Sequence, residues 1–210
     1  MIEVLIAGGI VVAVSVIAAI KLREKNRALI DALERVSKQK ESDSTSYKLP
    51  PQDSQMIEEC RRMLKTEFPL GVAETMKHMN LEERKKCMEI LTQKAAMIMH
   101  IDPVQVTFDE DPYCVGGYNF ENDTIVFSVA FLGNDDDLKM SVNTIFHELR
   151  HKLQFYSVEK ENVMGYHDEV LNKWKSEFYQ YIGPHLSIRL YYHQIIETDA
   201  RKYADEIFKA

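Results

Sequence analysis

The hydrophobic residues of this chain change their spacing along its length, and each spacing predicts a different structure. Residues 2–20, IEVLIAGGIVVAVSVIAAI, are apolar apart from Glu3, so this run has no polar face. At a rise of about 1.5 Å per residue, a helix of this length barely spans a hydrocarbon layer of about 30 Å. The positive charges follow the run, which favours an uncleaved anchor over a signal peptide and places the rest of the chain in the cytoplasm. Residues 1–20 are therefore predicted to form a transmembrane anchor, and the chain to be a single-pass membrane protein.

The chain becomes polar after the predicted anchor. Residues 21–40 are rich in charge and keep helical spacing, so we expect a charged juxtamembrane helix there. Residues 41–54, ESDSTSYKLPPQDS, are rich in Ser, Asp and Pro, which is typical of a linker. Residues 55–210 are then expected to form the folded domain.

Within this domain the apolar spacing alternates between the helical period and the strand period. Helical spacing covers residues 55–66, 80–99, 138–156, 167–181 and 186–208, and strand spacing covers residues 104–108, 113–120 and 125–132. Short consecutive strands flanked by helices predict an α+β fold with a small antiparallel sheet.

Composition narrows the possible functions. The chain has 210 residues, of which 45% are hydrophobic, enough for one core. Its net charge of -7 argues against general nucleic-acid binding, which needs clustered Lys and Arg. Cys60, Cys87 and Cys114 are odd in number and far apart, so we expect reduced thiols and neither a disulfide framework nor a zinc knuckle. The pattern fixes no oligomeric state.

The segment TIFHELRHKLQF, residues 144–155, carries the candidate chemistry. His147 and His151 are four positions apart, with Glu148 beside the first. Positions four apart share one face of a helix, so both imidazoles can bind one zinc ion, and catalytic zinc keeps a position for water. Glu148 could take the proton of that water as it attacks a carbonyl, and pass it to the leaving amine. By chance, a chain of this composition would contain the HExxH pattern with an expectation of only about 0.02, so the pattern favours a metal site.

A catalytic zinc ion needs a third protein ligand. The position six residues after His151 is Ser157, which excludes the metzincin pattern. The other candidates downstream are His167, His185, His193 and several carboxylates. The best candidate is Glu197, because it lies in the apolar part of the last predicted helix, where an acid needs a strong partner. Ala200 and Ala204 would let this helix approach the HExxH helix closely.

The two helices together resemble the gluzincin metallopeptidases, and are most similar to the ImmA/IrrE-type and minigluzincin-like families. The HExxH helix is followed by Glu-x-x-Ala-x-x-Tyr-Ala at residues 197–204, and residues 116–128, GGYNFENDTIVFS, resemble the strand pair that precedes the active helix in those families. The resemblance covers about residues 100–208. It implies an α+β zincin-like domain with one zinc ion, with Glu148 as general base. The implied zinc ligands are His147, His151 and Glu197.

The resemblance also implies a donor that stabilises the oxyanion, usually a Tyr or a His. His193, four residues before Glu197 and expected on the same helical face, is the first candidate, and Tyr192 and Tyr203 follow it. Asp199 could hold the second ring nitrogen of a ligand histidine, or could form a cap or an ion pair.

The chain departs from the family pattern near the motif, and a predicted strand has an unusual composition. The chain has Arg150 where those families often have Gly, and Gln154 and Phe155 where they often have a further His. Gly116 and Gly117 leave a predicted strand with little side-chain bulk. Such a strand either pairs with a peptide through its edge or contains a bulge that shapes the sheet.

These observations predict a membrane-anchored zinc peptidase that hydrolyses protein or peptide substrates. The alternative is a catalytically inert, zinc-stabilised interaction module tethered to the membrane. A structural membrane protein with a chance motif is the third possibility. Zinc content separates the third from the other two, and cleavage of a substrate separates the first two.

Overall fold

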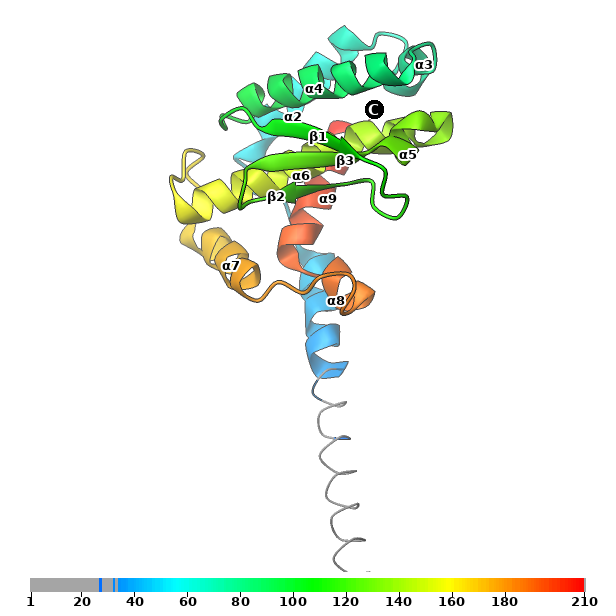
Figure 1. The fold of residues 1–210 in the computed structure, drawn as a ribbon. Helices are drawn as coiled ribbons and strands as arrows, with labels where there is room; N and C mark the ends of the chain where they lie inside the picture. The colour runs from blue at the N-terminus through cyan, green and yellow to red at the C-terminus, as the bar shows by residue number, and fades with distance from the viewer. Residues whose placement is uncertain (1–26, 28–31, 33, 210) are drawn as a thin grey trace, which may run out of the picture.

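The computed structural model describes residues 27, 32 and 34–209 of the chain. The described part is mostly helical and contains one small sheet (Figure 1). Residues 34–46 form a first helical stretch. The later elements are α2 (Asp53–Glu67), α3 (Val72–Met76), α4 (Leu81–Ile98), β1 (Gln105–Asp109), β2 (Gly116–Asn119), β3 (Thr124–Ser128), α5 (Val129–Gly133), η1 (Asp135–Asp137), α6 (Leu138–Glu159), α7 (Asp168–Tyr179), α8 (Ile188–Tyr192) and α9 (Ile195–Ile207).

The sheet is mixed, so the predicted antiparallel sheet is wrong. Its strand order is β1-β3-β2. β3 pairs in parallel with β1, with Thr124 opposite Gln105, and antiparallel with β2, with Phe127 opposite Gly116. The apolar strand β3 is buried along most of its length, while β1 and β2 are partly exposed. β3 therefore takes the central position, where both of its edges are paired and its side chains leave water.

Two predicted elements are divided. The predicted strand over residues 125–132 ends at Ser128, where the chain turns into α5. The predicted helix over residues 186–208 is divided into α8 and α9. The side chain of Gln194 lies at this break, where it accepts from the N–H of Ile182 at 2.8 Å and donates to the carbonyl of Ile182 at 3.1 Å. These two bonds hold the preceding loop against the start of α9.

The helix α6 lies at the centre of the domain. It contacts α9, α4, α7 and β2, and it runs behind the sheet in Figure 1. One side of α6 is apolar and has no exposure to solvent. It consists of Val142, Ile145, Phe146, Leu149 and Leu153. Burial of each such side chain contributes about 1.5–3 kcal/mol to the stability of the fold. Because these residues lie within the HExxH segment and on both sides of it, that segment is part of the core.

Arg150 is a buried cation on the same helix, with 0% of its surface exposed. It donates to Asp53 at 2.9 and 2.7 Å, to Asp199 at 2.6 and 3.1 Å, and to the Tyr166 hydroxyl at 2.8 Å. A guanidinium group has five N–H bonds, so this set of partners satisfies all of them. Because Asp53 begins α2 and Asp199 lies on α9, one side chain connects three helices.

Aromatic rings enclose the same guanidinium group. Its central carbon lies 5.4 Å from the ring centre of Tyr166, 5.1 Å from that of Trp174 and 4.8 Å from that of Tyr203. The faces of these rings attract a cation and exclude water from it. We call Arg150, Asp53 and Asp199 the buried ion cluster.

The predicted linker over residues 41–54 is partly helical and packs against the domain. The hydroxyl of Ser44 lies 2.8 Å from that of Thr198, and the hydroxyl of Tyr47 donates to Asp199 at 2.6 Å. The Ser-rich composition indicated a solvated linker, but these hydroxyls have partners on α9. The segment is therefore part of the folded unit.

The predicted anchor, residues 1–20, lies outside the described residues. Among residues 27, 32 and 34–209, no helix combines the length and the apolar character that crossing a bilayer requires. Even α6, with 22 residues, contains Lys139, Glu148, Arg150 and Lys152. The prediction of a single-pass protein located in a membrane is therefore not supported.

We expect Arg150→Met to lower the free energy of unfolding by about 3–5 kcal/mol, because it leaves two buried carboxylates without their cation. Arg189→Met is the matched control, since Arg189 pairs with Glu41 at 2.7 Å on the surface, and its loss should have little effect. Urea unfolding followed by circular dichroism measures both. Equal stabilities of the two variants would show that the buried ion cluster does not hold the helices together.

Candidate metal centre

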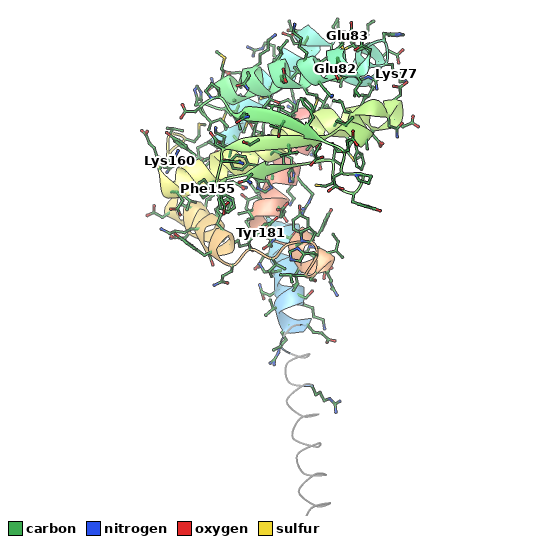
Figure 2. All side chains as sticks on the ribbon, in the orientation of Figure 1. Lys77, Glu82, Glu83, Phe155, Lys160 and Tyr181 are labelled. Atoms are coloured by element: carbon green, nitrogen blue, oxygen red, sulfur yellow. The ribbon has the colours of Figure 1, made fainter. Side chains whose placement is uncertain are left out.

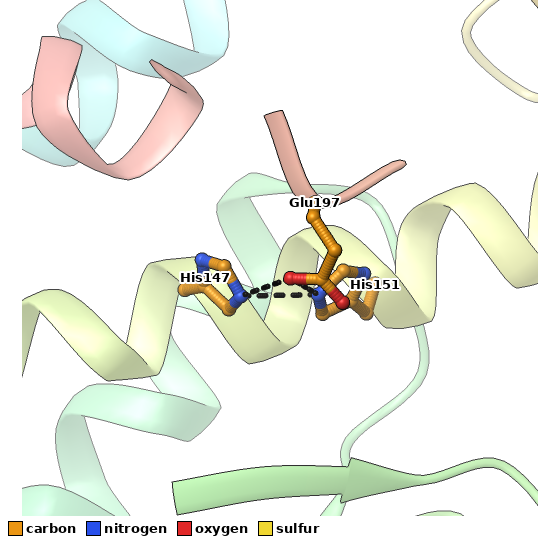
Figure 3. Close-up of side chains that lie close together, drawn as sticks. All are labelled: His147, His151 and Glu197. Carbon is orange, nitrogen blue, oxygen red and sulfur yellow. Dashed lines mark hydrogen bonds and ion pairs between the residues drawn. The ribbon is translucent and has the colours of Figure 1, made fainter. Parts of the chain in front are cut away.

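Three predicted ligands from two helices meet at one point. His147 and His151 come from successive turns of α6, and Glu197 comes from the first turn of α9 (Figure 3). The two Nε2 atoms lie 3.1 Å apart, and Oε2 of Glu197 lies 3.4 Å from that of His147 and 3.6 Å from that of His151. Ala200 and Ala204 on α9 are fully buried, as close packing of the two helices requires.

These distances match the donor set of a zinc ion. Ligand atoms at about 2.0–2.1 Å from zinc in a tetrahedral arrangement lie about 3.3 Å from one another. Oε2 of Glu197 is buried without a hydrogen-bond partner, and its nearest cationic side chain other than the imidazoles is Arg201, at 4.0 Å. A buried acceptor without a donor is costly, and a cation between the three atoms removes that cost. In the described part of the chain, this is the group of His, Cys, Asp and Glu residues that could hold a metal ion.

The short distances between Glu197 and the two imidazoles also shift the pKa values of the ligands. Burial lowers the pKa of His151, but the nearby charge of Glu197 outweighs burial and raises the pKa to about 9. Burial raises the pKa of Glu197, yet the two imidazoles hold it well below its usual range. Without a metal the carboxylate is therefore ionised and His151 carries its proton. A metal ion that binds here has to displace that proton.

Glu148 lies next to the ligand group. Only 6% of its surface is exposed. Its charge acts on His151 and on two phenols, Tyr181 and Tyr191. Glu148 follows the ligand His147 directly in the chain and its charge reaches the second ligand, His151, so the role of general base stays a prediction.

The two phenols were not predicted from the sequence. Tyr181 comes from the connection between α7 and α8 (Figure 2), and its hydroxyl donates to Oε1 of Glu197 at 3.0 Å. Tyr191 comes from α8, and its ring lies 6.3 Å from that of Tyr181, edge to face. Burial, and next the charge of Glu197, raises the pKa of both phenols well above its usual range, so both remain protonated donors. Both tyrosines lie outside any recognisable motif, so nothing in the sequence indicated that they belong to the site.

The predicted oxyanion donors lie elsewhere. His193 ends α8 and is not part of α9, so the expectation that it shares a helical face with Glu197 is wrong. Its Nδ1 lies 3.4 Å from the hydroxyl of Ser44. Tyr192 packs against Arg201, at 3.8 Å from its ring centre, and Tyr203 is buried against the ion cluster. The break between α8 and α9 leaves His193 and Tyr192 outside the helix that carries Glu197, whereas Tyr203 lies on that helix.

The other histidines considered as a third ligand are not in the group. His167 precedes α7, and His185 lies in the loop before α8, where its ring approaches the backbone of Gly183. Only Glu197 joins the two imidazoles of α6 among the described candidates.

We expect the protein to bind one zinc ion per chain, with an apparent affinity that falls about tenfold for each pH unit below about 9, because binding releases the proton of His151. Competition with a chromophoric chelator from mildly acidic to mildly alkaline pH measures this dependence. Glu197→Gln, which removes the charge of one ligand, should bind zinc more weakly throughout. An affinity that does not change with pH would contradict the assigned ligands.

No model of a known protein family matches the chain. No curated protein and no solved structure matches it either. What the site does therefore rests on its own geometry and chemistry.

Proposed function

We propose that this protein is a zinc-dependent peptidase of the gluzincin type, which hydrolyses peptide bonds of protein or peptide substrates. The observation that carries the proposal is the convergence of His147, His151 and Glu197 at 3.1–3.6 Å, with one buried carboxylate oxygen lacking a hydrogen-bond donor. The position of Glu148 beside this group adds a proton acceptor. A purely structural zinc site usually has four protein ligands, and among the described residues this group has three.

Each residue has a distinct task in peptide hydrolysis. Zinc, when bound, polarises the scissile carbonyl and makes a nucleophile available from water at neutral pH. Glu148 accepts the proton of the attacking water and delivers it to the nitrogen of the leaving amine. Tyr181 and Tyr191 are neutral phenols that bond to Glu197, so either one can stabilise the negative oxygen that forms on the carbonyl by turning its single hydroxyl hydrogen from Glu197 to that oxygen.

The edge of β2 is the proposed place for an extended substrate. The N–H of Ser128 donates to the carbonyl of Val115 at 3.0 Å, and antiparallel pairs alternate between bonded and non-bonded. Gly116 and Tyr118 therefore direct their backbone groups away from β3. The carbonyl of Gly116 accepts from the thiol of Cys114 at 3.0 Å, as expected for a group without a partner strand. A peptide can pair with this edge through its own backbone.

The two glycines of this strand differ in their surroundings. A Cβ at Gly116 would lie 2.8 Å from the carbonyl oxygen of Val126 and 2.9 Å from the side chain of Thr144. A Cβ at Gly117 would have no atom within 4 Å. Gly116 thus lets β2 approach both β3 and α6, and Gly117 leaves its surface open.

We expect Glu148→Gln to keep zinc binding and to lower kcat by about 10²–10⁴, because the amide cannot accept a proton. Cleavage of an unfolded protein substrate and zinc content are measured together. Glu159→Gln, the same change at the far end of α6, is the control and should remain active. If the zinc-loaded wild type cleaves no substrate in a broad peptide library, the proposal fails and the inert, zinc-stabilised module describes the protein.

Tyr181→Phe and Tyr191→Phe separate two tasks of the phenols. Loss of the donor to the oxyanion should lower kcat by about 10²-fold at unchanged zinc affinity. Loss of the bond to Glu197 should instead weaken zinc binding. Tyr192→Phe is the control, because Tyr192 is half-exposed and packs on Arg201 through its ring. If both variants keep the zinc affinity and the kcat of the wild type, the phenols have neither task.

A further inference from the structure

The second ring nitrogen of His151 is bound to a side chain that belongs to no metal motif. Its Nδ1 lies 3.0 Å from Oε1 of Gln154, one turn further along α6. The amide nitrogen of Gln154 donates to the carbonyl of Ile196 at 3.1 Å and to Oδ2 of Asp199 at 2.5 Å. Gln154 and Asp199 are both completely buried. A chain of hydrogen bonds therefore runs from His151 on α6, through Gln154, to Ile196 and Asp199 on α9.

The direction of each hydrogen bond in this chain follows from the chemistry of its ends. The carbonyl of Ile196 can only accept, and both oxygens of Asp199 accept from Arg150, so the NH₂ group of Gln154 must face them. Its oxygen must then face His151, and an oxygen without a proton can only accept. Nδ1 of His151 must therefore carry hydrogen. Once a metal displaces the second proton of the ring, its lone pair is on Nε2, the atom that faces Glu197, as a metal ligand requires.

Asp199 is itself held from two further sides. Arg150 donates to its Oδ2 at 2.6 Å and to its Oδ1 at 3.1 Å. The hydroxyl of Tyr47 donates to Oδ1 at 2.6 Å. Three donor groups from two segments, α6 and the segment before α2, thus fix the plane of this carboxylate, and with it the amide of Gln154.

Tyr47 has a defined position of its own. Its backbone carbonyl accepts from the ammonium group of Lys202 on α9 at 2.6 Å. Three residues earlier, the hydroxyl of Ser44 lies 2.8 Å from that of Thr198 on the same helix. The segment that precedes α2 is therefore attached to α9 at several points, and among its described residues Tyr47 is the one that donates a hydrogen bond to Asp199.

We propose that Gln154, Asp199 and Tyr47 are positioning residues that fix the protonation and orientation of His151 as an Nε2 ligand. The segment before α2 thereby contributes to the affinity of a metal site formed entirely by α6 and α9. This inference deepens the proposed function and rests on its ligand set. Groups that hold the second nitrogen of a ligand histidine typically contribute about 10–100-fold to metal affinity.

The test compares Gln154→Leu, Tyr47→Phe and the control Ser44→Ala in the full chain. Gln154→Leu should weaken zinc binding by about 10–100-fold, and Tyr47→Phe by a smaller factor, because it removes one donor to Asp199 and leaves Arg150 in place. Ser44→Ala removes a contact between the same segment and α9 but none to Asp199, so its zinc affinity should equal that of the wild type. Chelator competition measures zinc affinity, and thermal unfolding compares the stability of the three variants.

A second measurement does not depend on zinc. In the metal-free wild type, the Nδ1 proton of His151 should exchange slowly with water in ¹⁵N-edited spectra, because it is bound to Gln154. In Gln154→Leu this proton should exchange fast. A loss of stability alone would not single out this one ring proton.

The outcomes separate this inference from the proposed function. Equal zinc affinity and equal proton exchange in the wild type and Gln154→Leu would overturn the role of Gln154. A Tyr47→Phe variant that behaves like Ser44→Ala would overturn the contribution of Tyr47, and this variant loses only one oxygen, so it tests the inference even if Gln154→Leu does not fold. If the wild type binds no zinc but its ring proton is protected only when Gln154 is present, the proposed function fails and the positioning of His151 stands.

Discussion

The buried guanidinium group of Arg150 is the constraint on which the arrangement of the helices depends. A cation without access to water is stable only if its charge and all of its N–H groups have partners, and here Asp53, Asp199 and Tyr166 supply them. These partners come from α2, α9 and the loop before α7. This arrangement of the helices satisfies the charge, whereas apolar packing alone tolerates extensive rearrangement.

The candidate metal centre lies on the other side of the same contact between α6 and α9. Glu197 and Asp199 are two positions apart on α9, and both are buried. Glu197 lies against the imidazoles of α6, and Asp199 lies against Arg150 and Gln154. Burial of either acid without partners would be costly. Here each acid has its own set of partners, so both can be buried in this arrangement of α6 and α9. The ion cluster thus places α9 in the position that brings Glu197 to the two histidines.

The parts of the site that the sequence predicted are those determined by helical spacing. His147, Glu148 and His151 lie within five residues, and the geometry of one helix fixes their relation. Glu197 was identified as an acid in an apolar stretch, and the structure places it within 3.6 Å of both histidines. His193 was expected beside Glu197 on one continuous helix, but a break at Gln194 separates the two, and no local pattern indicated that Gln194 would bind Ile182.

The sequence by itself determined most of the helices and strands, the apolar side of α6 and the spacing of its two histidines, because these depend on periods of a few residues. Only the tertiary structure decided the mixed order of the strands, the partners of Arg150 and the position of Tyr181. It also decided that the segment with Tyr47, read as a linker, packs on α9. Each of these depends on contacts between residues far apart in the chain. Their free energies come from burial and from hydrogen bonds that exist only once the helices have met.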